Sequence, residues 1–387
     1  MPKNATSSFP ELFHVDMTNE WFPETLKKLD EGVKDQVAPG FVVGAWFLSD
    51  PNRFFSTARG QRRSSPLSLP MERNTVFDYA SVSKVFATAT LTALLVDRHW
   101  LNWDTPVSNI LTDFKYSKIQ IRHLLSHTAG FPAWIPFFKS LQEKFAPKPL
   151  HRVSIVERQK AMRSEVFATA LEFEPGARTL YSDLGFMTLG FVLEEILQMP
   201  LDQAAEKELW APMGIRGAHF RRVTQSIEAG REDSAAATES CSWRGGVVQG
   251  QVHDENCWAM GGYAGHAGVF GQISDLMQFS KRLLTGFLSS ETLQAMWTRV
   301  SQPPGCERTL GWDTPSGAIP SSGKLFSSKS VGHLGFTGTS LWIDPEAKLA
   351  VALLSNRVHT TRDNIKIREF RPVFHDAIRK DLANLNR

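Results

Sequence analysis

Ser81 and Lys84 are the two residues whose types and spacing most directly suggest chemistry. They stand three residues apart, just before the apolar stretch 86–96, and residues at this spacing share one face of a helix. A serine is a weak nucleophile until a base takes its proton, and a lysine can be that base if its pKa is lowered. Burial and the positive end of a helix dipole would lower it. The spacing predicts an activated serine; the alternative is a helix start capped by Ser81.

A second Ser-x-x-Lys pair, Ser321 and Lys324, provides an internal comparison. It lies in the run Pro315–Ser330, which is rich in serine, glycine and proline and is not expected to form a helix. Without a helix, nothing holds the hydroxyl and the amine together. The sequence therefore favours Ser81 as the nucleophile.

Two further motifs could complete a site around Ser81. Tyr181, Ser182 and Asp183 precede the apolar stretch 186–197, and a tyrosine there could carry a proton between nucleophile and leaving group. The alternative is a helix start at which Ser182 or Asp183 is the cap and Tyr181 packs. The glycine-rich run Gly332–Thr339 enters a predicted strand, where a backbone N–H could bind an oxyanion. Its alternative is a simple turn before a strand.

Histidines raise the question of a metal. The region His253–Gly268 is dense in polar groups, glycine and histidine, so it could be a metal site or a loop that lines a pocket. His123 and His127 form a His-x-x-x-His pair, but no glutamate stands between them as a zinc protease requires. Because no full ligand set has suitable spacing, we expect neither a metal nor another cofactor.

Composition excludes several classes of protein. The 387 residues are 42% apolar and 21% charged, as in a globular protein, with a net charge of +3 and no basic block interleaved with aromatics. We therefore expect a small-molecule or short peptide substrate and no nucleic acid, and the sequence leaves the oligomeric state open. No uninterrupted run of 18 apolar residues occurs, which argues against a membrane span.

The expected compartment follows from the amino terminus and the cysteines. The first ten residues contain no apolar signal segment, and Cys241, Cys257 and Cys306 are odd in number and lack metal-ligand spacing. A reducing cytoplasm fits these features best. A periplasmic or secreted location stays open if the chain is a processed form.

Hydrophobic periodicity predicts strands near both ends of the chain and helices between them. We expect an α/β (α+β) fold in which terminal helices flank an antiparallel sheet and a mostly helical domain is inserted. The predicted domains are a loose arm (1–15), a discontinuous sheet domain (16–75 and 265–387) and a helical domain carrying the nucleophile (76–264). The predicted elements are helices Trp21–Val37 and Pro372–Leu385, the latter with proline in its first turn, and strands Phe41–Leu48, Arg53–Gly60, Thr339–Asp344 and Leu349–Asn356.

Three motifs in this order, Ser81–Lys84, Tyr181–Asp183 and His333–Gly335, resemble the active-site triplet of the serine β-lactamase and penicillin-binding protein superfamily. The match is closest to its branch of class C β-lactamases, DD-carboxypeptidases and esterases. The resemblance extends over most of the chain and implies a β-lactamase/transpeptidase-like fold. Further segments that resemble this branch are Leu124–Pro132, His253–Gly268, Gly335–Pro345 and Leu354–His359.

The resemblance implies a role for each matched residue. Ser81 would be acylated, with Lys84 and Tyr181 managing its proton, and water would release the acyl group. The backbone N–H groups of Ser81 and Phe336 would form the oxyanion hole, and His333 would face Tyr181 and the substrate. Substrate contacts are expected from Asp183, His333, Gly335, Thr337 and Arg357.

Two departures from the class C pattern narrow the expected activity. Asp183 replaces an asparagine, so an acceptor-only carboxylate stands where the family has an amide donor. His333 replaces a lysine and is largely neutral near pH 7, which removes a permanent cation that would hold a substrate carboxylate. Arg357 is a candidate replacement for that cation.

We therefore expect a serine hydrolase that acts through an acyl-enzyme on an ester or on a D-amino-acid amide or peptide. An acyltransferase or a weak β-lactamase at the same site are alternatives. A catalytically silent binding protein of this fold is a third.

Overall fold

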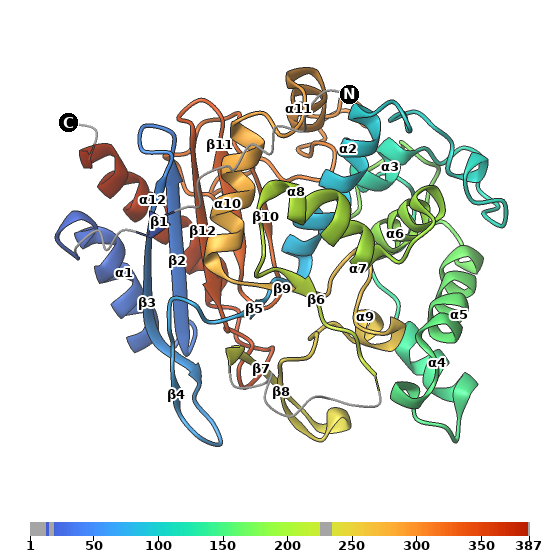
Figure 1. Cartoon of the computed structure of the whole chain (residues 1–387), viewed down its shortest axis with the longest axis horizontal. Coiled ribbons are helices and arrows are strands. Elements are labelled where there is room, and N and C mark those ends of the chain that lie inside the picture. The colour runs from blue at the N-terminus through green and yellow to red at the C-terminus, as the bar shows by residue number, and fades with distance from the viewer. Residues whose placement is uncertain (1–12, 15–18, 225–233, 386–387) are drawn as a thin grey trace, which may run out of the picture.

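The computed structural model describes residues 13–14, 19–224 and 234–385 (Figure 1). Its main sheet has the strand order β1-β3-β2-β12-β11-β10, and β4 pairs with β3. Neighbouring strands are antiparallel, as expected, except that β1 runs parallel to β3. The strands are β1 (Phe13–His14), β2 (Gly40–Phe47), β3 (Arg53–Arg63), β4 (Leu69–Pro70), β10 (Val331–Leu334), β11 (Ser340–Asp344) and β12 (Leu349–Ser355).

Helices cover both faces of this sheet. Figure 1 shows α1 and α12 against one face and α10 against the other, with the remaining helices grouped beside the sheet. The helices are α1 (Pro23–Lys34), α2 (Thr90–Asp97), α3 (Ile121–Leu125), α4 (Phe137–Phe145), α5 (Ile155–Ala168), α6 (Asp183–Leu197), α7 (Leu201–Ala204), α8 (Ala211–Met213), α9 (Glu255–Met260), α10 (Ile273–Leu284), α11 (Ser290–Trp297) and α12 (Ile367–Leu385).

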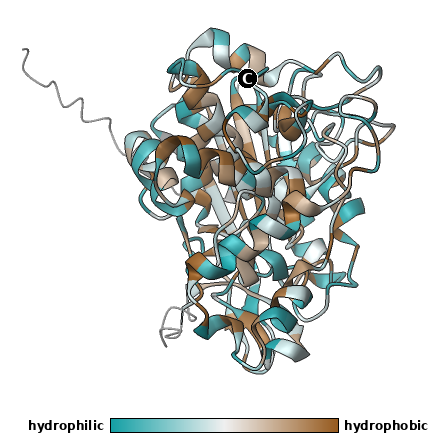
Figure 2. Cartoon of the chain, turned by 90° about the vertical axis from the view of Figure 1, so that its right-hand side faces the viewer, coloured by the Kyte–Doolittle hydropathy of each residue, from teal (hydrophilic) through white to brown (hydrophobic). Residues whose placement is uncertain are grey.

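Strand β2 shows why the sheet is covered on both sides. Its side chains alternate between two hydrophobic cores: Val42 and Trp46 belong to the core under α10, whereas Phe41, Val43 and Ala45 belong to the core under α1 and α12. A strand buried on both faces reads as a continuous apolar run. In Figure 2 many of the apolar (brown) ribbon segments lie toward the interior and many of the polar (teal) ones toward the periphery.

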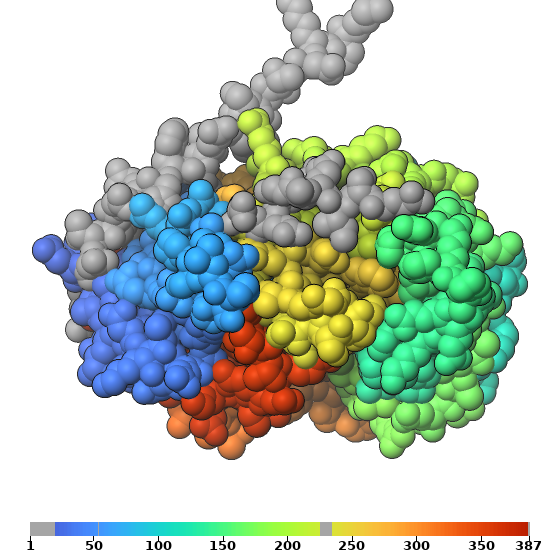
Figure 3. All heavy atoms as spheres, turned by 90° about the horizontal axis from the view of Figure 1, so that it is seen from below, coloured from blue at the N-terminus to red at the C-terminus, as the bar shows by residue number. Residues whose placement is uncertain are grey.

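Two smaller sheets complete the fold. One has the order β5-β9-β6 and the other pairs β7 with β8. Figure 3 shows that segments far apart in the sequence, coloured blue, yellow and red, meet on one face of the molecule. Two hydrogen bonds join such segments: the Arg63 side chain donates to the Gln249 side chain at 2.9 Å, and the Ser64 N–H donates to His359 Nε2 at 3.1 Å. The strands are β5 (Phe77–Asp78), β9 (Val269–Gly271), β6 (His219–Phe220), β7 (Ala237–Cys241) and β8 (Gly246–Gln249).

The structure corrects the expected start of the last helix. Helix α12 begins at Ile367, so Pro372 lies inside it rather than in its first turn. One missing N–H is tolerated there because Phe370, Phe374 and Ile378 bury the helix against the sheet. The predicted loose arm 1–15 falls mostly outside the described residues, but Phe13–His14 form a strand of the sheet. The proposed domain division 16–75 and 265–387 against 76–264 stays a prediction.

Within the described part of the chain, the helix Ala80–Asp97 is long and apolar enough to cross a membrane, and 83% of it is buried inside the protein. The segments Asp183–Leu197 and Leu201–Met213 meet the same criterion only together, and they are bent by 71° relative to each other. Packing in the protein core accounts for the apolar composition of the first helix, which carries the predicted nucleophile.

Gly44 sets how closely α10 approaches β2. A Cβ added at Gly44 would lie 2.6 Å from Ile273 Cγ1, so Gly44→Ala overpacks this contact and should lower the free energy of unfolding by about 1–3 kcal/mol. Urea unfolding of Gly44→Ala, Ile273→Ala and the double variant checks the cause. Because the new methyl group partly fills the space left by Ile273→Ala, the double variant should lose less than the sum of the two; strict additivity would contradict the contact.

Candidate active site

Ser81 lies in a tight turn at the start of the central helix. The 3₁₀ turn Ala80–Val82 leads through the π-helical segment Lys84–Ala89 into α2. The Asp78 carboxylate accepts the Ala80 N–H at 2.8 Å, so Asp78 rather than Ser81 binds a free N–H at this helix start. Ala80 has a φ of 48°, a strained value for a residue with a side chain. The Ser81 side chain is left partly exposed and free of a capping role.

Lys84 is fully buried beneath Ser81, and its amine has three close acceptors. Lys84 Nζ lies 3.0 Å from Ser81 Oγ, 2.9 Å from the His266 carbonyl oxygen and 2.7 Å from Asp183 Oδ1. The first two contacts are hydrogen bonds and the third is an ion pair. The structure thus brings Ser81 and Lys84 together as their spacing predicted, and adds Asp183 as a counterion.

This counterion overturns the expected charge state of Lys84. Burial lowers the pKa of Lys84, but the Asp183 carboxylate and the Tyr181 phenol raise it by more, so its pKa lies above that of a free lysine. Burial and the helix dipole, which were the basis of the prediction, both favour the neutral amine. The Asp183 carboxylate comes from a distant segment, so the local sequence around Lys84 does not reveal its effect. In the resting protein Lys84 is therefore a cation.

Tyr181 lies against the same amine, with Lys84 Nζ 5.1 Å from the centroid of its ring. Burial raises the pKa of Tyr181, while the Lys84 charge and hydrogen bonds with Lys84 and Ser81 oppose the rise. His127 packs on the ring at 4.4 Å, and its Nδ1 accepts the Ser182 N–H at 3.1 Å. His127 thus holds the turn that presents Tyr181 and Asp183.

The third motif places His333 beside Tyr181, with their ring centroids 6.1 Å apart. Burial lowers the pKa of His333 to about 4, so its imidazole is neutral at pH 7. A cation does stand nearby: Arg308 Cζ is 5.2 Å from the centroid of the Tyr181 ring, and the guanidinium is ion-paired with Asp313. No sequence motif marked Arg308, which lies in an irregular segment before β10.

The loop 335–339 is fastened to the segment that precedes Ser81. Thr337 Oγ1 donates to the Asp78 carbonyl and Thr339 Oγ1 to the Tyr79 carbonyl, both at 2.9 Å. A Cβ on Gly335 would lie 1.9 Å from Thr339 Oγ1, so only glycine fits at this close approach. Among the described residues, the Phe336 N–H has no hydrogen-bond acceptor, whereas the Gly335 N–H bonds the Thr339 carbonyl at 2.8 Å and the Gly338 N–H bonds the Gly335 carbonyl at 3.1 Å.

Two buried arginines hold this loop from behind. Arg371 on α12 donates to the carbonyls of Gly335 at 3.0 Å and Thr339 at 2.9 Å. Arg357 donates to the carbonyls of Phe336, Arg362 and Asn364. Burial lowers the pKa of Arg371 to about 9, so it stays charged at pH 7. Arg357 is 6% exposed, and its guanidinium already donates to these three carbonyls. The Thr337 hydroxyl is likewise bonded to the Asp78 carbonyl. Substrate contacts of Thr337 and Arg357 stay predictions, and their observed hydrogen bonds do not support them.

The polar region 253–268 forms the wall on the other side of Lys84. Asp254 caps α9 by accepting the Cys257 N–H at 2.7 Å, and its Oδ1 lies 2.8 Å from His266 Nε2. This pair presents the His266 carbonyl to Lys84. A Cβ on Gly265 would lie 1.9 Å from the Phe186 carbonyl oxygen, so the loop packs directly on the backbone of α6.

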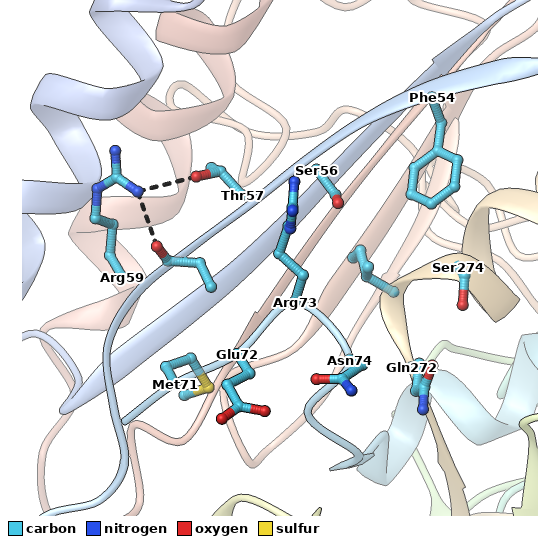
Figure 4. A pocket seen from close by; sticks show the side chains of 12 residues that line it. Phe54, Ser56, Thr57, Arg59, Met71, Glu72, Arg73, Asn74, Gln272 and Ser274 are labelled. Carbon is cyan, nitrogen blue, oxygen red and sulfur yellow. Dashed lines mark hydrogen bonds between the residues drawn. The ribbon is translucent and has the colours of Figure 1, made fainter. Parts of the chain in front are cut away.

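Two other places in the molecule were candidates for chemistry. Ser321 and Lys324 lie in turns outside any helix, as expected. A hollow of about 730 Å³ lies between β3 and the start of α10, where Figure 4 shows Arg59 bonded to Thr57 and to the carbonyl of residue 58. Among the described residues that line this hollow there is no lysine, histidine or tyrosine to activate its serines. The candidate active site is therefore the group around Ser81.

Comparisons with known proteins identify the family of the chain. A protein of Salmonella agona (strain SL483) named "Putative D-alanyl-D-alanine carboxypeptidase" is 30% identical to this chain over 380 residues, and the match covers 89% of this chain and 85% of the relative. The solved structure of EstCE1, titled a hydrolase with promiscuous acyltransferase activity, superposes with a TM-score of 0.69 at 23% identity and covers 93% of this chain and 98% of that one.

A second solved structure, simvastatin synthase LovD from Aspergillus terreus (LovD6 mutant), gives a TM-score of 0.70 at 19% identity and covers 95% of this chain and 99% of that one. At these identities the structures show the shared β-lactamase/transpeptidase-like fold. The family model described as Beta-lactamase matches residues 27–372, which include every residue of the candidate site. The chain therefore belongs to the β-lactamase family.

Proposed function

We propose that this β-lactamase-fold serine hydrolase opens an ester or a D-amino-acid amide or peptide through an acyl-enzyme on Ser81. The observation that carries the proposal is the contact of Lys84 Nζ with both Ser81 Oγ and Asp183 Oδ1. The relatives at 30% identity are named as carboxypeptidases, and a structural neighbour is titled a hydrolase, which supports the same reaction class.

The charge state of Lys84 dictates how Ser81 is activated. A protonated lysine cannot accept a proton, so the ammonium must pass one proton to the Asp183 carboxylate as it takes the proton of Ser81. Lys84 then stays charged, Asp183 becomes a neutral acid, and the Ser81 oxygen bonds to the substrate carbonyl carbon. The bond between the acyl carbon and the leaving group then breaks as this proton returns through Lys84 and Tyr181 to the leaving group, which leaves the acyl group on Ser81. In deacylation a water molecule gives one proton to the same relay and bonds to the acyl carbon, and the Ser81 ester bond breaks as the proton returns to the Ser81 oxygen.

The loop 335–339 supplies the oxyanion site in this proposal. The unbonded N–H of Phe336 and the N–H of Ser81 would donate to the developing oxyanion. The peptide group that contains the Phe336 N–H also contains the Gly335 carbonyl, which accepts from the buried Arg371. A cation bonded to one end of a peptide group polarises its N–H at the other end, so Arg371 both positions and strengthens this donor.

Replacing Ser81 tests the nucleophile. Ser81→Ala should abolish covalent labelling by a fluorophosphonate or a fluorescent penicillin, because Ser81 is the serine whose hydroxyl lies within hydrogen-bond distance of Lys84 Nζ in the described structure. Ser321→Ala removes the serine of the other Ser-x-x-Lys pair and should label like the wild type in gel fluorescence and intact-mass measurements. Labelling of Ser81→Ala at the wild-type rate would refute the assignment, and a wild type that no acylating probe labels would favour the silent binding protein.

Replacing Asp183 tests the proton path. In Asp183→Asn the final acceptor is lost, so acylation by p-nitrophenyl acetate at pH 6 should fall at least roughly tenfold. Burial of Lys84 without its carboxylate lowers the lysine pKa, so the rate should recover as rising pH produces the neutral amine. Burst kinetics between pH 6 and 10 measure this, with Asp183→Glu as the variant that keeps a carboxylate. A wild-type burst rate of Asp183→Asn at pH 6 would exclude the relay.

Replacing Arg371 tests the support of the oxyanion loop. Arg371→Met should lower kcat for p-nitrophenyl acetate by roughly tenfold or more and change KM little, since the loss concerns the transition state. Arg379→Met is the matched control, because Arg379 lies on the same helix and bonds the Leu325 carbonyl instead. Equal kcat values for the two variants, both folded by circular dichroism, would remove Arg371 from the mechanism.

A further inference from the structure

The basic side chains around Tyr181 differ in how exposed they are and in how many of their donors are already bonded. Lys84 is fully buried and is already paired with Asp183 and bonded to Ser81 and the His266 carbonyl. The Arg308 side chain is 23% exposed. His127 and His333 are buried, and burial holds both imidazole pKa values below the usual histidine value. Of the charged and titratable groups packed against Tyr181, Arg308 is thus the accessible cation.

Arg308 is held in place by the edge of the sheet. Asp313 exchanges two backbone hydrogen bonds with Gly332 on β10, at 2.8 and 2.9 Å, directly beside His333. Asp313 also pairs with Arg308 through a single guanidinium nitrogen, Nη1. In the described residues no acceptor is bonded to Nε or Nη2 of Arg308, so this edge of the guanidinium is free. A guanidinium has five N–H donors and can serve two carboxylates at once.

The exposure of the site residues indicates where a substrate binds. Ser81, Tyr181 and Arg308 are partly exposed, whereas Lys84 and His333 lie beneath them. If the acyl carbon bonds to Ser81 and Tyr181 protonates the leaving group, Arg308 stands on the leaving-group side. The buried pair of Lys84 and Asp183 is neutral overall, so it neither attracts nor repels an anion placed there.

We propose that Arg308 binds a free carboxylate on the leaving group, and thereby selects peptides that end in a D-amino acid over neutral esters. This inference rests on the proposed function of Ser81. In this proposal Arg308, which comes from another segment, supplies the positive charge for the substrate carboxylate that the neutral His333 cannot supply. It also differs from the expectation for Arg357, whose described bonds all go to backbone carbonyls.

A matched set of substrates tests this assignment. The set consists of an acetylated peptide ending in D-Ala-D-Ala, the same peptide with a C-terminal amide, and p-nitrophenyl acetate. Arg308→Gln should lower kcat/KM for the acid about 10- to 100-fold, mostly through KM, and leave the amide and the ester within about twofold. Arg308→Lys keeps a cation and should recover part of the loss on the acid.

Each other outcome contradicts the assignment. An equal loss on all three substrates would mean that Arg308 acts on Tyr181 rather than on a carboxylate, and an unchanged acid would exclude binding. If the wild type cleaves only the ester, competition replaces turnover: the peptide acid should inhibit ester hydrolysis more strongly than the amide, and Arg308→Gln should remove the difference. Absence of that difference overturns the role of Arg308, whereas absence of ester turnover and of Ser81 labelling overturns the proposed function. Thermal unfolding of both variants verifies the fold.

Discussion

The buried contact between Lys84 and Asp183 is the constraint on which the rest of the site depends. A lysine with no exposed surface is stable as a cation only where its charge is paired and its donors are satisfied. The chain meets this need with a carboxylate from the start of α6 and a carbonyl from the loop that α9 and His266 position. The start of α6 and the loop that contains His266 must therefore both be folded against Lys84 before Lys84 can act on Ser81.

A different constraint acts on the loop 335–339, which we propose as the oxyanion site. Its Phe336 N–H is bonded to nothing in the described structure, while the carbonyls of Gly335, Phe336 and Thr339 accept from arginine side chains. Threonine hydroxyls fasten it to the backbone before Ser81, and buried arginines occupy the carbonyls behind it. Rigid support of this kind keeps a donor aimed without reorganisation during the reaction.

Local patterns in the sequence were sufficient for much of the fold and for part of the site. The apolar runs of β2 and β12 and the three-residue spacing of Ser81 and Lys84 are properties of short segments, so they could be predicted. The start of α12 was missed because burial of Phe370 and Phe374 outweighs the proline rule. The charge of Lys84 and the place of Arg308 depend on contacts between distant segments, which neither periodicity nor motif spacing contains.

The central claim is that Lys84 is a cation in the resting protein. Lysine labelled with ¹³C at Cε reports this directly by NMR, because the Cε shift differs between ammonium and amine, and Lys84→Arg identifies the signal. With the Asp183 carboxylate in contact, the signal should keep its ammonium shift from pH 6 to 10, beyond the point where an unpaired buried lysine would titrate. An amine shift at pH 7 would contradict the account and return Lys84 to the role of a neutral base.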